Sequence, residues 1–430
     1  ATTIIYMSRP LMKSRREFLK LAALSPVIAS YPPLASAATP FAGKFVVTVQ
    51  AVGAWDVTCF CDPKENQRGE LAITKWSQDN ETQSVGNIKY APFANNEAFF
   101  KKHASKMLVI NGADSQTNAH GIGETVNWSG RTAAGYPTLT AMYSAVKAPN
   151  LPMSYVSFGG FSRTENVIRS TQIGWSVDQI AELLRPNFNN DRGVIDDELW
   201  SLIKTLHAND SKSLLSDESM VAGNRRSREA YLSSIQTMDP LVEFSNLLPT
   251  RENLAPRGEN GFLKQQAQFA ITAFKAGVSV AADLNMGGFD THEENDSQQE
   301  PLLAELTDGL DYLWEAAEEA GIADRLVVIV GSDFSRTPYY NSGDGKDHWP
   351  IGSYIIMEKG ARYTNRLVDG TDELQNALAI DPKTLKPSTF GTKILTSHVH
   401  DALRDYLGLA NASTTAIFPF NNPEKFNFFG

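Results

Sequence analysis

The sequence has 430 residues but only two cysteines, Cys59 and Cys61, which are too few for a disulfide-stapled scaffold. A bridge between residues that are neighbours but one would be strained and would close almost no loop. The favoured interpretation is therefore a buried pair of free thiols, and a redox or soft-metal role stays open beside it.

The N-terminal region also lacks an apolar run long enough to remain in a membrane. Its apolar stretch, Leu21 to Ile28, has about eight residues, whereas a spanning helix needs roughly 20. The stretch follows the paired arginines of the segment SRREFLK (residues 14–20) and precedes Ala-Ser-Ala at 35–37, a small-residue cleavage site. This order predicts a twin-arginine signal region over residues 1–37, with a basic helix that stays attached as the alternative. We expect the mature protein, residues 38–430, to be exported to the periplasm or beyond by the twin-arginine machinery.

The sequence has no excess of basic residues. The formal net charge is −10, and removal of residues 1–37 takes away five basic side chains and one acidic one, which leaves −14. Nucleic-acid binding depends on neutralising phosphates, so this charge argues against a nucleic-acid partner. It does not argue against a metal site, because a bound divalent cation reverses the local field.

Short apolar runs alternate with helical patterns along the mature chain. We expect strands at 45–49, 107–110, 155–158, 278–284, 326–330 and 353–357, and helices at 97–104, 300–320 and 398–407. This alternation predicts an α/β fold with a largely parallel central sheet and helices on both faces. The stretch from about 165 to 260 is mostly helical in pattern and could be an inserted cap.

Acidic residues and histidines follow several of the predicted strands. They are Asp56 after the first strand, Asp290 and His292 after the strand at 278–284, Asp333 after the strand at 326–330, and Asp347 and His348 in the next loop. A single aspartate after a strand is usually a turn former or a helix cap. Several at successive strand ends converge on one edge of a parallel sheet. Asp56, Asp290, His292, Asp333 and His348 therefore predict a site for one or two divalent metal ions, with zinc, manganese, magnesium and calcium all compatible.

Two further residues are candidates for catalysis. His120 lies in TNAHGIGETVNWSG, where two glycines permit a close backbone approach, although a structural histidine is an equal alternative. Arg336 follows Asp333 in a short turn, and its planar fork suits a phosphate or sulfate group. The alternative is an arginine that pairs with a nearby aspartate and holds the loop. His398 and His400 point in different directions on a helix and are interpreted as structural.

Four segments carry a resemblance to a known family: AWDVTCFCDPK, TNAHGIGETVNWSG, GGFDTH and SDFSRTPYYNSGDGKDHWP. Over about residues 43–410 the chain resembles the domain-of-unknown-function family 1501, which is similar to the alkaline phosphatase and sulfatase superfamily. The resemblance implies an alkaline-phosphatase-like α/β sandwich with metals at the strand ends. It matches Asp56 to the first ligand, Asp290 and His292 to the second group, Asp333 to the third and His348 to the late histidine.

The sequence departs from the superfamily pattern at two positions. Phe334 follows Asp333 where an Asp-His pair is expected, so one metal would lose a ligand. Ala119 stands before His120 where relatives commonly carry serine, so the nucleophile is absent from the matched position.

The resemblance implies an exported metal-dependent hydrolase or transferase that acts on phosphate or sulfate esters. Its substrate would be a small ester or a polysaccharide-like anion, with His120 as general acid or base and Arg336 as the anion clamp. The alternative is a catalytically inactive protein of the same fold that keeps a metal and serves a structural, surface or polysaccharide-associated role.

Overall fold

One eight-stranded sheet organises the chain, in the order β12-β4-β11-β8-β1-β7-β5-β6. The computed structural model describes residues 41–159, 161–173, 197–236 and 238–430, so the predicted signal region at 1–37 lies outside the described residues. In sheet order the strands are β12 (Arg366–Val368), β4 (Met107–Asp114), β11 (Ile351–Glu358), β8 (Leu326–Ser332), β1 (Phe45–Ala51), β7 (Ala281–Met286), β5 (Tyr155–Ser157) and β6 (Ser170–Gln172). Strand β11 runs antiparallel to β4 and β8, and the other neighbouring pairs are parallel. The predicted α/β fold with a largely parallel sheet is confirmed.

The central strands are buried along their whole length. Every residue of β1 (FVVTVQA) and β8 (LVVIVGS) is buried. Val47 of β1 aligns with Ala282 of β7 on one side and with Val328 of β8 on the other. Parallel strands that are covered on both faces need near-continuous apolar runs, and these two sequences supply them.

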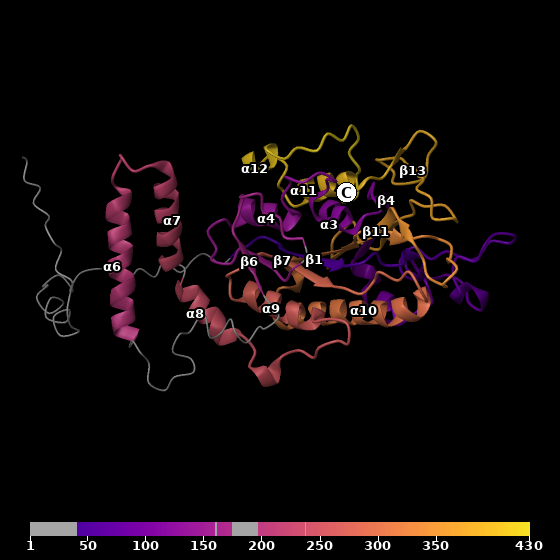
Figure 1. Cartoon of the computed structure of the whole chain (residues 1–430), viewed down its shortest axis with the longest axis horizontal. Coiled ribbons are helices and arrows are strands. Elements are labelled where there is room, and N and C mark those ends of the chain that lie inside the picture. The colour runs from indigo at the N-terminus through magenta and orange to yellow at the C-terminus, as the bar shows by residue number, and fades with distance from the viewer. Residues whose placement is uncertain (1–40, 160, 174–196, 237) are drawn as a thin grey trace, which may run out of the picture. The chain divides into compact units, whose positions relative to one another are not determined.

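Helices cover both faces of this sheet (Figure 1). Helices α9 (Leu263–Lys275) and α10 (Asn295–Glu319) lie together on one face, where α9 contacts β7. The opposite face carries α3 (His120–Ser129), α4 (Leu139–Lys147) and α11 (Thr396–Tyr406), which contact β8, β7 and β4 respectively. The carboxyl ends of β1, β4, β7 and β8 therefore share one edge, framed by helices of both layers.

Strand β11 departs from the expected parallel arrangement. The strand predicted at 353–357 exists, but residues 333–350 connect it to β8 without a helix. A parallel return usually needs a helix that crosses a face of the sheet, and because this connection has none, the chain comes back antiparallel. It contains only two short strands that pair with each other, β9 (Ser335–Arg336) and β10 (His348–Trp349).

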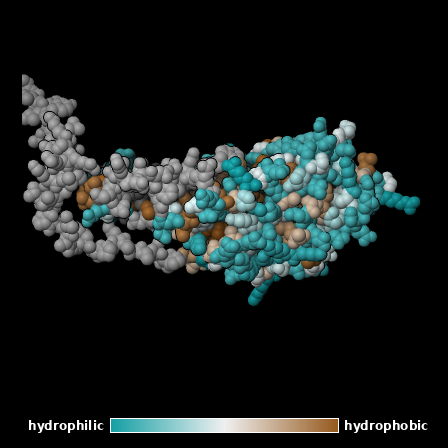
Figure 2. Space-filling model, turned by 90° about the horizontal axis from the view of Figure 1, so that it is seen from below, coloured by the Kyte–Doolittle hydropathy of each residue, from teal (hydrophilic) through white to brown (hydrophobic). Residues whose placement is uncertain are grey.

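The predicted helical stretch at 165–260 contains three described helices, α6 (Asp197–Leu215), α7 (Ala222–Gln236) and α8 (Met238–Leu247). Its first residues belong to the sheet, because β6 pairs with β5. Residues 174–196 of this stretch lie outside the described residues. Several of the described large apolar side chains that are exposed belong to these helices and their connections: Leu206, Leu214, Val221, Tyr231, Val242 and Leu247. Elsewhere the face seen in Figure 2 is mainly hydrophilic.

The remaining described elements are short: β2 (Gln83–Val85), β3 (Ile88–Tyr90), β13 (Ala379–Ile380), β14 (Thr392–Lys393), α2 (Asn96–His103) and α12 (Ser413–Ala416). Among the described helices, none is both long and apolar enough to cross a bilayer. Cys59 and Cys61 are free and buried, which confirms the interpretation as unpaired thiols. Burial raises the pKa of both thiols, so neither is a ready thiolate.

Candidate metal centre

The loops after four parallel strands meet at the carboxyl edge of the sheet. Gly53 follows β1, His120 follows β4, Asp290 follows β7 and Asp333 follows β8. The loops after β1 and β7 approach so closely that a Cβ atom on Gly53, whose φ is +109°, would lie 2.6 Å from the backbone nitrogen of Asp290. Only glycine tolerates both that contact and that φ angle.

His120 is the first residue of α3, and its ring is fixed from behind by Asp333. The distance between His120 Nδ1 and Asp333 Oδ2 is 2.7 Å. The Asp333 side chain is fully buried, and it also accepts hydrogen bonds from Gln50 Nε2 and, over 3.1 Å, from the Gly53 amide. A carboxylate in this position takes the Nδ1 proton, so Nε2 of neutral His120 carries a lone pair. The hydrogen bond with Asp333 raises the pKa of His120 above its ordinary value.

His348 lies on β10 and is oriented by a backbone carbonyl. Its Nδ1 is 2.7 Å from the carbonyl oxygen of Asn118, which can only accept a hydrogen bond. Nδ1 of His348 therefore carries the proton, and Nε2 presents a lone pair. Burial lowers the pKa of His348, which favours this neutral form.

These lone pairs converge with a carboxylate oxygen. The two Nε2 atoms of His120 and His348 are 3.1 Å apart, and Asp290 Oδ1 lies 3.2 Å from the first and 3.5 Å from the second. Three acceptors cannot satisfy one another, so the arrangement requires a cation or a proton between them. Two imidazole nitrogens and one carboxylate oxygen form a ligand set suited to zinc and to other transition metals, and the outer nitrogen of each histidine is already bonded to an acceptor, as in known metal sites. Among the described residues, this is the one group of three potential ligands close enough to share an ion.

Arg336 holds the carboxylate of this group. Its Nη2 donates to Asp290 Oδ1 over 2.7 Å. Burial alone would raise the pKa of Asp290, but the hydrogen bond and charge of Arg336 outweigh it and lower that pKa to about 2. Asp290 is therefore a carboxylate throughout the neutral range.

The guanidinium of Arg336 is itself fully buried and extensively bonded. It donates to four carbonyl oxygens, those of Gly53, Ala54, Phe289 and Lys346. These contacts tie together the loops after β1 and β7 and the loop before β10. The structure thus places Arg336 beneath the site, as a residue that positions Asp290, rather than as an open clamp for an anion.

His120, His348 and Asp290 are called the triad below. The other predicted ligands lie at different distances from it. His292 is at its rim, with Nδ1 3.1 Å from Asp290 Oδ1 and a side chain that is 45% exposed. Asp333 lies one step behind the triad, bonded to His120. Of the five predicted ligands, Asp290 and His348 belong to the converging group, and His120, predicted as a catalytic residue, joins them.

Asp56 lies outside this group, in a buried ion pair. Its Oδ2 is 2.8 Å from Lys346 Nζ, and Thr58 and Asn295 also donate to its carboxylate. Burial alone would raise the pKa of Asp56, but the charge and hydrogen bond of Lys346 lower it below the usual value. The structure therefore gives Asp56 a resident cation from its own chain, two residues before His348.

Phe334 occupies the space beneath the two imidazoles. Its buried ring lies 4.9 Å from the ring of His120 and 4.8 Å from that of His348, measured between centroids. Helix α3 packs directly on this ring, because a Cβ atom on Gly123 would come within 2.9 Å of Phe334 Cδ1. A phenylalanine ring thus occupies the position where the resemblance led us to expect the histidine of an Asp-His pair.

Two supporting residues, Gln50 and Asn127, and a nearby acidic residue, Glu124, were not predicted from the sequence. Gln50 holds Asp333 and in turn accepts from Asn127 Nδ2 over 2.5 Å. Gln50 could have been noticed in the sequence, because it is a polar residue near the end of the apolar run FVVTVQA. Glu124 lies one turn after His120 on α3, half-buried, and its burial and the charge of Asp333 raise its pKa.

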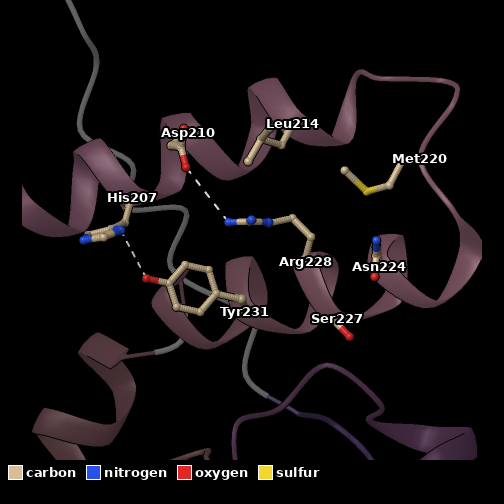
Figure 3. Close-up of a pocket in the computed structure, with 8 residues that line it drawn as sticks. All are labelled: His207, Asp210, Leu214, Met220, Asn224, Ser227, Arg228 and Tyr231. Carbon is tan, nitrogen blue, oxygen red and sulfur yellow. Dashed lines mark hydrogen bonds and ion pairs between the residues drawn. The ribbon is translucent and has the colours of Figure 1, made fainter. Parts of the chain in front are cut away.

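A separate hollow of about 570 Å³ lies within the hairpin of α6 and α7 (Figure 3). There the hydroxyl of Tyr231 lies 3.2 Å from Nδ1 of His207, and Arg228 lies 3.9 Å from Asp210. All four side chains are open to solvent and paired within the hairpin. This hollow has no convergent set of free acceptors, so the triad at the sheet edge remains the stronger candidate.

The fold and the centre together define an α/β protein with a histidine–aspartate site at the strand ends. Residues 44–402 match the family described as "Protein of unknown function (DUF1501)", so the chain belongs to that family, as its motifs predicted. No curated protein matches the chain.

Solved structures with a similar arrangement include three enzymes. The chain is similar to the lipoteichoic acid synthase LtaP from Listeria monocytogenes, with 10% identity, a TM-score of 0.35, and coverage of 86% of this chain and 73% of that one. It is similar to a 2-O GAG sulfatase, with 9% identity, a TM-score of 0.35, and coverage of 86% and 72%. It is also similar to the alkaline phosphatase of the Antarctic bacterium TAB5, with 11% identity, a TM-score of 0.34, and coverage of 76% and 94%.

Proposed function

We propose that this protein is an exported, metal-dependent hydrolase or transferase of phosphate or sulfate esters. The observation that carries the proposal is the convergence of His120 Nε2, His348 Nε2 and Asp290 Oδ1, because none of these three atoms has a hydrogen to donate to the others when both histidines are neutral. The ester substrate is inferred from the motif resemblance, and the metal requirement from the ligand geometry.

The residues of the chain divide into ligands and supports. His120, His348 and Asp290 would hold the ion, Asp333 and the Asn118 carbonyl set the tautomers, and Arg336 positions the carboxylate. A divalent ion held here would supply Lewis-acid polarisation of the ester and would lower the pKa of a coordinated water. His292 remains a proposed additional ligand, because it already reaches the Asp290 oxygen from the open side of the site.

For the hydrolase in this proposal, the nucleophile is water. The residue before His120 is Ala119, which has no hydroxyl, and the hydroxyl of the nearby Ser115 donates to backbone carbonyls at Thr117 and Pro350. Attack by water requires no covalent intermediate on the protein. The proposal therefore predicts hydrolysis without a burst of the leaving group.

The first test measures bound metal and activity in the same preparations. The mature protein, purified without chelator, should contain about one equivalent of a transition metal and should hydrolyse aryl phosphates or aryl sulfates. Asp290→Asn should lose both properties, whereas Asp347→Asn, an exposed change beside His348, should keep them. Wild-type protein that stays metal-free after incubation with zinc and manganese would refute the metal centre.

A second candidate is supported by Phe334 and Ala119. The ring of Phe334 takes the place of another histidine ligand. Ala119, at the matched nucleophile position, has no hydroxyl group. A protein with these features can keep a metal for structural or surface-associated purposes without catalysis. One equivalent of metal with no turnover of any ester, also in Ala119→Ser, would favour this second candidate.

A further inference from the structure

A basic pocket lies at the edge strand of the sheet, away from the candidate metal centre. Its volume is about 620 Å³, within the range of ligand sites in proteins. Three segments line it: the β2–β3 turn, the start of β12, and the turn at 383–386 that follows β13. The C-terminal residues Asn427 and Gly430 close the remaining side.

The register of the sheet places this pocket at the opposite end from the triad. Arg366, the first residue of β12, aligns with Leu108 near the amino end of β4. The chain leaves the carboxyl end of β4 at Asp114 and reaches His120 six residues later. Six residues of strand separate Leu108 from Asp114, which corresponds to about 20 Å. The pocket is therefore distinct from the candidate metal centre.

Three cationic side chains line the pocket: Arg366, Lys383 and Lys386. Both lysines are exposed, and in the described part of the chain none of the three forms an ion pair within 4.0 Å. Arg366 donates a hydrogen bond from Nη1 to the carbonyl oxygen of Phe428 over 3.0 Å. Lys383 lies close enough to Asp381 for its charge to add to backbone hydrogen bonds in lowering the pKa of that carboxyl, but three cations gathered in a chain of net charge −10 still mark a local positive field.

The acidic side chains near the pocket, Asp381 and Asp369, already have partners. Asp381 accepts the backbone amides of Lys383 and Thr384, both over 2.8 Å, and so shapes the turn. Asp369 pairs with Lys89 over 2.7 Å. None of the residues that line the pocket is an aspartate or a glutamate, whereas three of them carry cations.

The neutral part of the lining is rich in amides and hydroxyls. Asn87 is fixed by two hydrogen bonds with Asn365, from its amide to Oδ1 over 2.8 Å and from its Nδ2 to the carbonyl over 2.9 Å. Asn427 and Thr384 add further polar groups, and no aromatic side chain belongs to this lining. Amides and hydroxyls suit the hydroxyl groups of sugars, whereas proteins that bind single-stranded nucleic acid stack bases on aromatic rings.

We propose that this pocket binds a segment of an anionic polysaccharide, with Arg366, Lys383 and Lys386 on its sulfate, phosphate or carboxylate groups. The spread of three cations over an open pocket favours a polymer with repeated charges over a single small anion. The proposal does not depend on the metal centre. Binding here would hold the protein on a charged glycan whether or not the centre is catalytic.

The test uses the mature protein and fluorescent dextran sulfate, with uncharged dextran of the same length as the reference. Binding is measured by polarisation at 50 and 150 mM salt. Lys383→Glu combined with Lys386→Glu should weaken the Kd for dextran sulfate at least tenfold. The matched control, Lys212→Glu with Lys275→Glu, makes the same charge change at two exposed lysines on α6 and α9 and should stay within twofold of wild type.

Three results would overturn the proposal. The first is equal weakening by both double variants, which would show a response to net charge alone. The second is displacement by inorganic sulfate at the same concentration of charge, which would show a site for a small anion. The third is equally tight binding of a single-stranded oligonucleotide. Matching melting curves for the two double variants ensure that a lost affinity is not a lost fold.

Discussion

Asp333 acts on the candidate centre through one hydrogen bond to His120. Because the carboxylate is fully buried and also bonded to Gln50 and Gly53, it has no freedom to leave that histidine. The tautomer of His120, and with it the lone pair offered to an ion, depends on this single contact.

Replacement of Asp333 by asparagine should therefore weaken metal binding without removing a ligand. The asparagine amide can donate to Nδ1, which would turn the protonated nitrogen of His120 toward the site. We expect a 10- to 100-fold loss of affinity for zinc, measured by competition with a fluorescent chelator. Asp347→Asn serves as the control, and an unchanged affinity in Asp333→Asn would contradict the proposed support role.

Metal affinity should also depend on pH in a defined direction. The raised pKa of His120 means that the metal-free protein keeps a proton on this ring to a higher pH than an isolated histidine does. The ion must displace that proton, so affinity should rise about tenfold per pH unit for as long as His120 is protonated in the metal-free protein. Asp290, with a pKa of about 2, adds nothing to this slope above pH 4. Calorimetric titration with zinc from pH 5.5 to 8 measures the slope, and a flat profile would contradict a histidine-based site.

At the scale of elements, Asp283 joins four parts of the fold. It lies on β7 and accepts hydrogen bonds from Thr48 of β1, Thr140 of α4 and Tyr155 of β5. Burial raises the pKa of Asp283 to about 6, although the three hydroxyl groups work against that shift. This carboxyl is thus a polar junction in an apolar core.

Asp283 should add stability to the metal-free protein in mild acid, against the opposite effect of the buried His103 and His400, whose pKa values burial lowers to about 4. Between about pH 6 and pH 4 the folded state holds a proton on Asp283 that the unfolded chain releases, so the contribution of Asp283 to the free energy of unfolding should increase as pH falls through 6. The gain can reach about 3 kcal/mol at pH 4 relative to pH 7. Urea unfolding of wild type and Asp283→Asn across this range isolates the contribution. Parallel pH profiles for the two proteins would show that Asp283 does not titrate in this way.

The sequence predicted elements better than it predicted contacts between them. The strands β1, β4, β7 and β8 were predictable because each is a short apolar run that the core buries on both faces. The direction of β11 was not, since periodicity carries no information about strand orientation.

The candidate site was also only partly predictable, because local sequence patterns do not show which distant residues meet. Its position at the strand ends followed from the alternation of strands and helices, and Asp290 and His348 were predicted as ligands there. The division into ligand and support was not predictable, because it depends on which nitrogen of His120 meets Asp333, 213 residues away. Asp56 has its partner Lys346 290 residues away, a pairing that no local pattern reveals.

At the scale of the whole molecule, export in the folded state remains a proposal that stands on residues 14–37. Conversion of Arg15 and Arg16 to lysine should leave the protein in the cytoplasm with its signal region attached. Fractionation of cells that express both forms, with detection of the size difference, measures this outcome. Normal export of the double variant would indicate a different route.

The pairing of β1 has a consequence for how the chain is made. Its two partners are distant: Val46 aligns with Ala281 of β7, and Phe45 aligns with Leu326 of β8. At roughly 5–20 residues per second, a ribosome needs roughly 15 to 55 s to travel from Phe45 to Leu326. Until the ribosome has passed Met286, the buried strand β1 has neither neighbour, and until it has passed β8 it lacks one of the two. The centre of the sheet can therefore close only after synthesis has passed β8, which makes its formation a late event in the folding of the chain.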